Sequence, residues 1–455
     1  MTIKKIILVT GLWGCSVPVF ALDLVGVYQL AKNNDPALQA DQYQFQADQL
    51  NLGLATGNLL PTVTLAGNVT RDRQTVKNDQ SFELPAFGDA SNALVSNTST
   101  KKQVSLTARQ PIFRMDAWQG YKQVKTSVLL SEVTLKIQKQ QHILDVAEAY
   151  FNVLRQQALS AAYLQEEQAL LQQLDMMNAK LKQGFVAKSD VSEANAQYQN
   201  ARANRIAGEV QMMLAQEQLN QYIGANSTQN LATLRPDFQF QSPYPAQLQD
   251  WLMLAQTHNL AIQQATLQRQ YAEDGRRVEK AALYPQLNAV ATYGYTDQSP
   301  ETLISTNGQF DQIGLELSWN VFNGGQTRTS IKKASILIDK AQSQLDTAKR
   351  NASVDVKKAF LQLETDQSKL QARKAAMSSA ELVSQSSRAS YNEGLKTMVD
   401  VLLAQRNAFS AKQDYLNAQY DYLVNVLKLK AAVGQLSEQD LAELNAWLMP
   451  EKIQD

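Results

Sequence analysis

The chain has 455 residues, of which 44% are hydrophobic and 19% are charged. Lys and Arg total 43, and Asp and Glu also total 43, so composition offers no electrostatic footprint for nucleic acid or for an anionic lipid surface. Partners must therefore be recognised by shape or by local charge. The length is compatible with two or more domains or with one elongated body.

The N-terminus has the pattern of a secretory signal. Lys4 and Lys5 precede an apolar run over residues 6–13, and the sequence VFA at 19–21 matches the small-residue pattern that signal peptidase cuts. We predict a signal peptide over residues 1–21 and a mature chain that begins near Leu22. The protein would then leave the cytoplasm.

Cys15 leaves an alternative open. Leu12-Trp13-Gly14-Cys15 resembles the box in which a cysteine becomes the acylated first residue of a lipoprotein, although Trp13 stands where a small residue is expected. Cys15 is the only cysteine of the chain. Cleavage after residue 21 would leave a mature chain without disulfides.

The sequence contains an internal repeat. Gly184 and Asp190 recur as Gly394 and Asp400, 210 residues later, and each pair lies between long Ala- and Gln-rich stretches. We predict repeat 1 over 22–224, an inter-repeat linker over 225–247, repeat 2 over 248–434 and a C-terminal segment over 435–455. A period this long indicates an internal duplication and not a short-period solenoid.

Each repeat carries one predicted strand hairpin, over about 62–72 and 102–113 in repeat 1 and about 286–298 and 309–322 in repeat 2. Apolar residues alternate with polar ones along these segments, and Tyr293, Tyr295 and Trp319 add aromatics near the rims. A half-buried soluble sheet also alternates, but the long polar loop of the first hairpin favours strands in an outer membrane. After the signal, no run of about 18 apolar residues occurs, so any membrane passage must use strands. Four strands cannot close a barrel, whereas three chains would supply twelve.

Long helices fill the remainder of each repeat. The proline-free stretches Asp116–Gln183 and Gln326–Glu393 predict rods of roughly 100 Å at about 1.5 Å per residue. Apolar and small residues spaced three and four apart predict antiparallel coiled-coil pairing with the shorter arms that follow. The reversals fall at about 183–190 and 392–400, where Gly184 and Gly394 end a helix. Thr397 is expected to cap the next helix, with Asp400 near its positive end.

The chain lacks most of the residue types that enzymatic catalysis would need. The chain has two histidines, His142 and His258, and the mature chain would have no cysteine, so we expect no catalytic residues, no metal site and no cofactor. His142 is interpreted as a packed or solvated helix residue. Asp190 and Glu193, three apart on a helix, resemble a carboxylate pair, but surface charge is the simpler interpretation.

The second repeat resembles the TolC family of outer-membrane efflux proteins, through the stretch YNEGLKTMVDVLLAQRNAFSAKQDYLNAQYDYLVNVLKLK. The resemblance covers about 24–448 and implies a mainly α fold with a membrane β-barrel. In that fold a homotrimer shares one twelve-stranded barrel, continued by a helical tunnel in the periplasm. The implied function is an exit duct for drug efflux or type I secretion. The implied partners are outer-membrane lipid, a periplasmic adaptor and an inner-membrane transporter of the ABC, RND or MFS class, with no nucleic acid.

The resemblance also implies a gate at the helical tips. Asp190, Tyr391 and Lys396 match the network that ties neighbouring coiled coils together, and Asp400 matches an acidic ring that lines the pore. A second acidic ring falls on Leu403, so the cation attraction typical of relatives is in doubt. The adaptor is expected to dock near Gly184 and Gly394.

A competing hypothesis is a protein that has the long helices but does not enter the membrane. A periplasmic coiled-coil adaptor or scaffold would share the helices without needing four ten-residue strands with aromatic rims. The sequence does not reveal the exported substrates or the transporter that the duct would serve.

Overall fold

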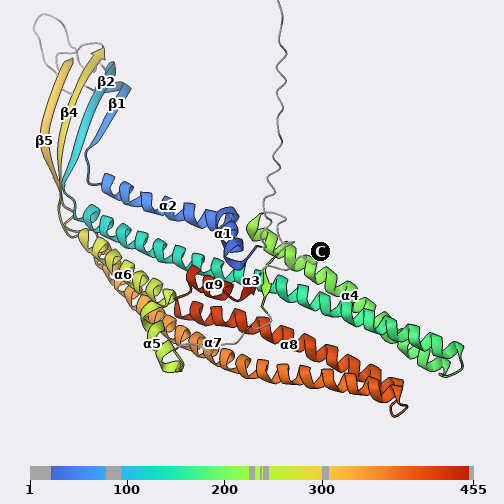
Figure 1. Ribbon diagram of the computed structural model, residues 1–455. Helices are drawn as coiled ribbons and strands as arrows, with labels where there is room; N and C mark the ends of the chain where they lie inside the picture. The colour runs from blue at the N-terminus through green and yellow to red at the C-terminus, as the bar shows by residue number, and fades with distance from the viewer. Residues whose placement is uncertain are drawn as a thin grey trace, which may run out of the picture. The chain divides into compact units, whose positions relative to one another are not determined.

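The computed structural model describes residues 22–77, 94–224, 231–235, 238, 245–299 and 307–449 (Figure 1). The predicted signal peptide, Cys15, most of the predicted polar loop of the first hairpin and most of the predicted linker lie outside the described residues. The chain divides into two units. Unit 1 comprises Met1–Gln42, Leu135–Ile262 and Lys349–Asp455, and unit 2 comprises Tyr43–Thr134 and Gln263–Ala348.

Unit 2 contains a four-stranded antiparallel sheet in the order β1-β2-β4-β5. Its strands are β1 (Thr62–Lys77), β2 (Leu94–Phe113), β4 (Gln286–Ser299) and β5 (Gly308–Ser318). Pairing of β1 with β2 continues to Lys77 and Leu94, so the first hairpin is longer than the sequence predicted. β5 stops at Ser318, earlier than predicted, because its partner there is Gln286, the first residue of β4.

The register of the sheet gathers most of its apolar residues on one face. One row runs across all four strands through Val63, Ala108, Ala291 and Ile313. The row that includes Thr64, Thr107, Thr292 and Gln312 lies on the other face, where the hydroxyls of Thr107 and Thr292 are 3.3 Å apart. This separation follows from the period of two along each strand.

Helices adjoin the sheet in unit 2. They belong to α2 (Pro36–Gly57), α3 (Met115–Lys182), α6 (Leu260–Ala281) and α7 (Gln326–Asn392). α3 has 68 residues and α7 has 67, as the proline-free stretches predicted, and both continue into unit 1. α2 begins where Asp35 accepts a hydrogen bond from the Ala37 N–H at 2.9 Å and Pro36 occupies the first helical position.

Unit 1 contains the remaining helices, which are α1 (Leu24–Asn34), α4 (Lys188–Ile223), α5 (Leu248–His258), α8 (Met398–Val433) and α9 (Glu438–Asn445). A core cluster joins α1, α3, α4 and α8 through Leu24, Tyr150, Leu219 and Leu427, all fully buried. The two ends of the described chain meet here. The Asn445 amide donates to Asp23 at 2.7 Å, and β3 (Thr233–Leu234) pairs with β6 (Leu448–Met449).

The fold is therefore mainly helical with antiparallel strands, as the sequence predicted. In the described part of the chain, no helix is long and apolar enough to cross a membrane. The described residues also contain no cluster of three His, Cys, Asp or Glu side chains suited to a metal ion.

Candidate functional site

Two helical tips in unit 1 share one backbone geometry. Gly184 has φ 78° and Gly394 has φ 76°, in the left-handed region that glycine adopts without a steric penalty. Phe185 N–H donates to the Lys180 carbonyl at 3.0 Å, and Leu395 N–H donates to the Ser390 carbonyl at 2.9 Å. These bonds lie 210 residues apart, so the sequence repeat is also a repeat of turn structure.

An acid follows each tip and bonds to the helix start. The Thr397 hydroxyl accepts from the Asp400 N–H at 3.3 Å, and the Asp400 carboxylate accepts from the Thr397 N–H at 2.9 Å. The Thr397 hydroxyl also lies 2.6 Å from the Asp400 carboxylate, and hydrogen bonds from this hydroxyl and from the Thr397 N–H lower the pKa of Asp400 below its ordinary value. Asp190 accepts from the Ala187 N–H at 3.3 Å. Each acid therefore stabilises its own helix start, whatever else it does.

Within one chain, the three predicted gate residues have separate partners. Tyr391 lies against Lys180, whose ammonium is 3.3 Å from the phenol oxygen and 4.5 Å from the ring centroid. The Lys396 ammonium donates to the Ser387 hydroxyl at 2.8 Å, and Ser387 is only 1% exposed. Asp190 and Lys396 form no ion pair with each other among the contacts of the described residues. Sequence reasoning missed Lys180, whose one signal is a basic residue in the last turn of α3.

The tips carry two sets of apolar side chains, one buried between the helices and one exposed at the turns. Met177, Ala194 and Val401 are buried together, and they join α3, α4 and α8. At the turns themselves, Phe185 and Leu395 are each 75% exposed, although they occupy matching positions of the repeat. Leu403, one turn beyond Asp400, is 55% exposed and places an apolar side chain where an acid was expected.

The predicted interface aromatics lie in unit 2. Tyr293 and Tyr295 are exposed on the apolar face of β4. Trp319 follows the last residue of β5, and its indole N–H donates to the Leu283 carbonyl at 3.2 Å, at the end of α6. Trp319 therefore lies at the junction between sheet and helices, and its place at a membrane interface stays a prediction.

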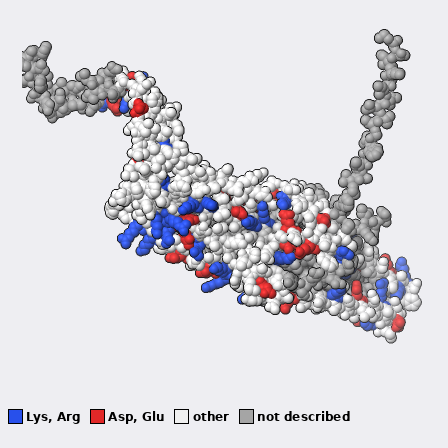
Figure 2. Space-filling view, turned by 60° about the vertical axis from the view of Figure 1, so that its left-hand side comes forward, with Lys and Arg blue, Asp and Glu red and all other residues white. Residues whose placement is uncertain are grey.

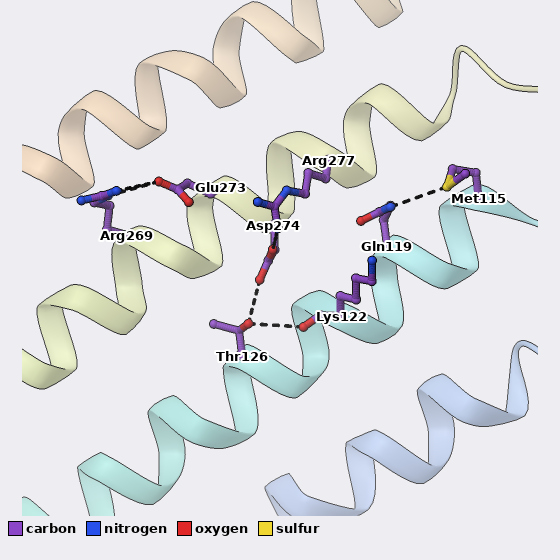
Figure 3. Close-up of polar contacts among 8 residues, drawn as sticks. All are labelled: Met115, Gln119, Lys122, Thr126, Arg269, Glu273, Asp274 and Arg277. Atoms are coloured by element: carbon purple, nitrogen blue, oxygen red, sulfur yellow. Dashed lines mark hydrogen bonds and ion pairs between the residues drawn. The ribbon is translucent and has the colours of Figure 1, made fainter.

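A polar cluster joins α3 and α6 beside that junction (Figure 3). Asp274, only 3% exposed, accepts from the Thr126 hydroxyl at 2.7 Å and from the Arg277 guanidinium at 2.7 Å. Arg269 pairs with Glu273 at 3.0 Å, further from the sheet on α6. The buried carboxylate is thus satisfied by one hydroxyl and one cation, an arrangement that holds α3 against α6. Periodicity did not reveal this pair.

His142 lies buried in unit 1 between Tyr28 and Tyr222. Its Nε2 is 3.1 Å from the Asp35 carboxylate. Burial lowers the pKa of His142, and the charge of Asp35 opposes that change. His142 is therefore a packed core residue, one of the two interpretations that the sequence left open.

A groove of about 480 Å³ lies between α3, α4 and α8 in unit 1. Two ion pairs line it, Arg155 with Asp421 at 2.8 Å and Lys428 with Glu148 at 2.9 Å, and Asp145 is the one further charged residue of the lining. This arrangement leaves little net charge to attract a small charged ligand.

Comparison with known proteins identifies the class. The chain matches the family described as "Outer membrane efflux protein" over residues 27–225 and 251–435, one match for each repeat. The chain therefore belongs to the outer membrane efflux protein family, as the sequence resemblance predicted. It is located in the outer membrane and extends into the periplasm.

Individual relatives cover nearly the whole chain. Outer membrane protein TolC of Escherichia coli is 31% identical over 435 residues, which are 93% of this chain and 85% of TolC. Alkaline protease secretion protein AprF of Pseudomonas aeruginosa is 26% identical, over 97% of this chain and 91% of AprF. The crystal structure of the outer membrane protein VceC from Vibrio cholerae has a TM-score of 0.74 at 17% identity, covering 90% of this chain and 96% of VceC. The VceC likeness supports the fold alone.

Proposed function

We propose that three copies of this chain form a passive channel that carries substrates from an inner-membrane transporter to the outside of the cell. The four-stranded sheets would close into one twelve-stranded barrel, and the long helices would continue it as a tunnel in the periplasm. The channel would contribute no chemistry of its own, in keeping with the channel proteins to which it is related.

One observation carries the proposal, namely a sheet with one apolar face and two unpaired edges. β1 and β5 are the edge strands of the sheet. In lipid, each unpaired backbone N–H or C=O costs several kcal/mol, so an open sheet edge is not stable there. Pairing β5 of one chain with β1 of the next would satisfy both edges. Three chains closed in this way give an even-numbered barrel within the known size range.

The gate is proposed at the tips. Asp190, Tyr391 and Lys396 would link neighbouring chains there, and three copies of Asp400 would line the constriction. The position of Lys396 supports the proposal. Its ammonium donates to Ser387 of the same chain, yet the residue stays exposed and can reach a neighbouring chain. Opening would be an iris-like rearrangement, biased by a partner that binds the open form more tightly.

The partners follow from the family and from the tip surface. An adaptor would dock near Gly184 and Gly394, where the exposed side chains of Phe185 and Leu395 offer apolar contact area. The name of AprF specifies protease secretion and the family description specifies efflux, so we propose a tripartite role in one or both processes. The transporter would be of the ABC, RND or MFS class.

Single-channel conductance in planar bilayers tests the proposal. We expect small, steady openings from the wild-type protein and larger or more frequent openings from Lys396→Ala. Lys374→Ala is the matched control, because Lys374 is an exposed lysine on the same helix α7. Unchanged conductance in Lys396→Ala would refute the gate, and a folded wild-type oligomer that does not conduct would refute the pore.

The periplasmic scaffold is the alternative that the sequence left open; the long helices are common to scaffold and channel, and the outer-membrane location of the family argues against the scaffold. The scaffold predicts a protein extracted without detergent. A heat-sensitive oligomer in the outer-membrane fraction would favour the channel over the scaffold.

A further inference from the structure

We propose that the helices next to the sheet bind the phosphate groups of anionic phospholipids in the periplasm-facing leaflet of the outer membrane. The binding surface, which we name the basic collar, consists of Arg276 and Lys280 on α6 and Arg328, Lys332 and Lys333 on α7. Figure 2 shows Lys and Arg side chains gathered on the helices next to the base of the sheet. The inference rests on the proposed passage of the sheet through the membrane.

The collar lies close to the sheet, at the helix ends that connect to the strands. α6 ends at Ala281, five residues after Arg276, and α7 begins at Gln326, seven residues before Lys333. At about 1.5 Å per residue, all five cations lie within about 12 Å of the helix ends that join the strands. α6 and α7 run side by side from the sheet (Figure 1), and the Arg269 guanidinium donates to Gln342 across them at 3.2 Å.

Exposed aromatics occupy the level between the apolar strands and the collar. Tyr284, Trp319 and Phe322 all lie in the short connections between strand and helix, and all are exposed. Aromatic side chains favour the membrane–water interface, and lipid phosphates lie just outside that level. The order apolar strand, aromatic junction and cationic helix end therefore matches the order of hydrocarbon, interface and headgroup.

The acids near the collar are largely occupied. Asp274 binds Thr126 and Arg277, and Glu273 binds Arg269. Glu279 is an exposed acid in the last turns of α6 that pairs with none of the collar cations. The five collar cations form no ion pair among the described residues. Positive charge is thus concentrated locally in a chain whose total charge is zero.

The fold does not require this charge. The repeat-1 residues that correspond to Arg276, Lys280, Arg328, Lys332 and Lys333 are Leu52, Thr56, Trp118, Lys122 and Gln123. Only Lys122 is basic, although the same helices and strands form in both repeats. The collar is therefore a property of repeat 2 that packing does not explain. Basic clusters beside a membrane contribute about a fivefold gain in lipid binding for each Lys or Arg near an anionic surface.

The test is a lipid titration of the purified full-length protein in detergent, followed by native mass spectrometry at about 0.15 M salt. The probes are dioctanoyl phosphatidylglycerol and dioctanoyl phosphatidylcholine. The collar variant combines Lys280→Gln, Arg328→Gln, Lys332→Gln and Lys333→Gln. The control variant combines Lys349→Gln, Arg350→Gln, Lys357→Gln and Lys358→Gln, which removes equal charge from exposed residues of α7 in unit 1.

We expect the wild-type and control proteins to bind phosphatidylglycerol at least tenfold more tightly than phosphatidylcholine, and the collar variant to lose this preference. Raising the salt to about 0.5 M should reduce the preference through screening. If the fourfold variant fails to assemble, the pairs Lys280→Gln with Arg328→Gln and Lys332→Gln with Lys333→Gln provide the same comparison in smaller steps.

Three results would overturn the inference. One is equal binding of the two lipids by the wild-type protein, and another is an equal loss of preference in collar and control variants. The third is a collar variant that keeps the wild-type preference for phosphatidylglycerol. A conducting wild-type protein without lipid preference would refute the collar alone, whereas a non-conducting one would refute the channel.

Discussion

The contact between Lys180 and Tyr391 yields a prediction with a definite magnitude. Lys180 is in the last turn of α3 and Tyr391 in the last turn of α7, so this pair fastens one helical tip to the other. Replacing Lys180 with Met keeps most of the side-chain length and removes the charged donor. The substitution therefore isolates the polar contact from the packing beside it.

The magnitude follows from two contributions. The hydrogen bond to the Tyr391 oxygen contributes about 1 kcal/mol. The ammonium, 4.5 Å from the ring centroid, adds about 0.5 kcal/mol in a partly exposed setting. Because solvent reaches both side chains, we take about 1 kcal/mol in total, which corresponds to about a fivefold change in the ratio of loosened to fastened tips. Tyr391→Phe removes only the hydrogen bond and should give about a threefold change.

The assay is single-channel recording, with the fraction of time spent at enlarged conductance as the measured quantity. We expect that fraction to rise about fivefold in Lys180→Met and less in Tyr391→Phe. Lys182→Met is the matched control, because Lys182 is an exposed lysine at the same helix end. Equal effects of Lys180→Met and Lys182→Met, or a larger effect of Tyr391→Phe than of Lys180→Met, would refute the reasoning.

Three further predictions concern stability. Thr397→Val should destabilise the first turn of α8 by about 1 kcal/mol, seen as faster amide hydrogen exchange there, because the cap bond to the Asp400 N–H is lost. Because the pKa of Asp400 is lowered, the stability that its carboxylate gives to the first turn of α8 should be present above pH about 4 and be lost as the pH falls below that value. Asp274→Ala should lower the free energy of unfolding in denaturant by about 2 kcal/mol, because Thr126 loses its carboxylate acceptor. Because burial lowers the pKa of His142, the stability linked to its neutral form should be present above pH about 6.5 and be lost at lower pH, and His142→Gln should flatten that dependence.

Each of these predictions has an internal control. Thr397→Ser keeps the hydroxyl and should exchange like the wild type, so slow exchange in Thr397→Val would contradict the cap. Glu279→Ala removes an exposed acid from the same helix as Asp274 and should change stability by less than about 0.5 kcal/mol. His258→Gln should leave the pH dependence in place, since His258 is exposed. An unchanged pH profile in His142→Gln would show that other groups set it.

The sequence predicted the features that depend on local chemistry. Glycine at 184 and 394 defines the turns because only a residue without a Cβ enters the left-handed region freely. Alternation along the strands and the absence of proline from the rods predicted element type, since both act within a few residues. The family resemblance came from the continuous stretch that begins at Tyr391. Strand ends were less accurate, because pairing with a neighbouring strand, as between Ser318 and Gln286, decides where a strand stops.

Pairings between distant residues were decided by the tertiary structure. The sequence showed two hairpins, but the pairing of β2 with β4 joins them into one sheet with two free edges. Lys180 beside Tyr391, Asp35 beside His142 and Thr126 beside Asp274 each join residues more than 100 positions apart. Periodicity places a residue on a face of its own helix and carries no information on which helix that face meets. The sequence alone thus predicted the long rods, the strand hairpins and the tip turns, whereas packing in three dimensions determined which of their side chains work together.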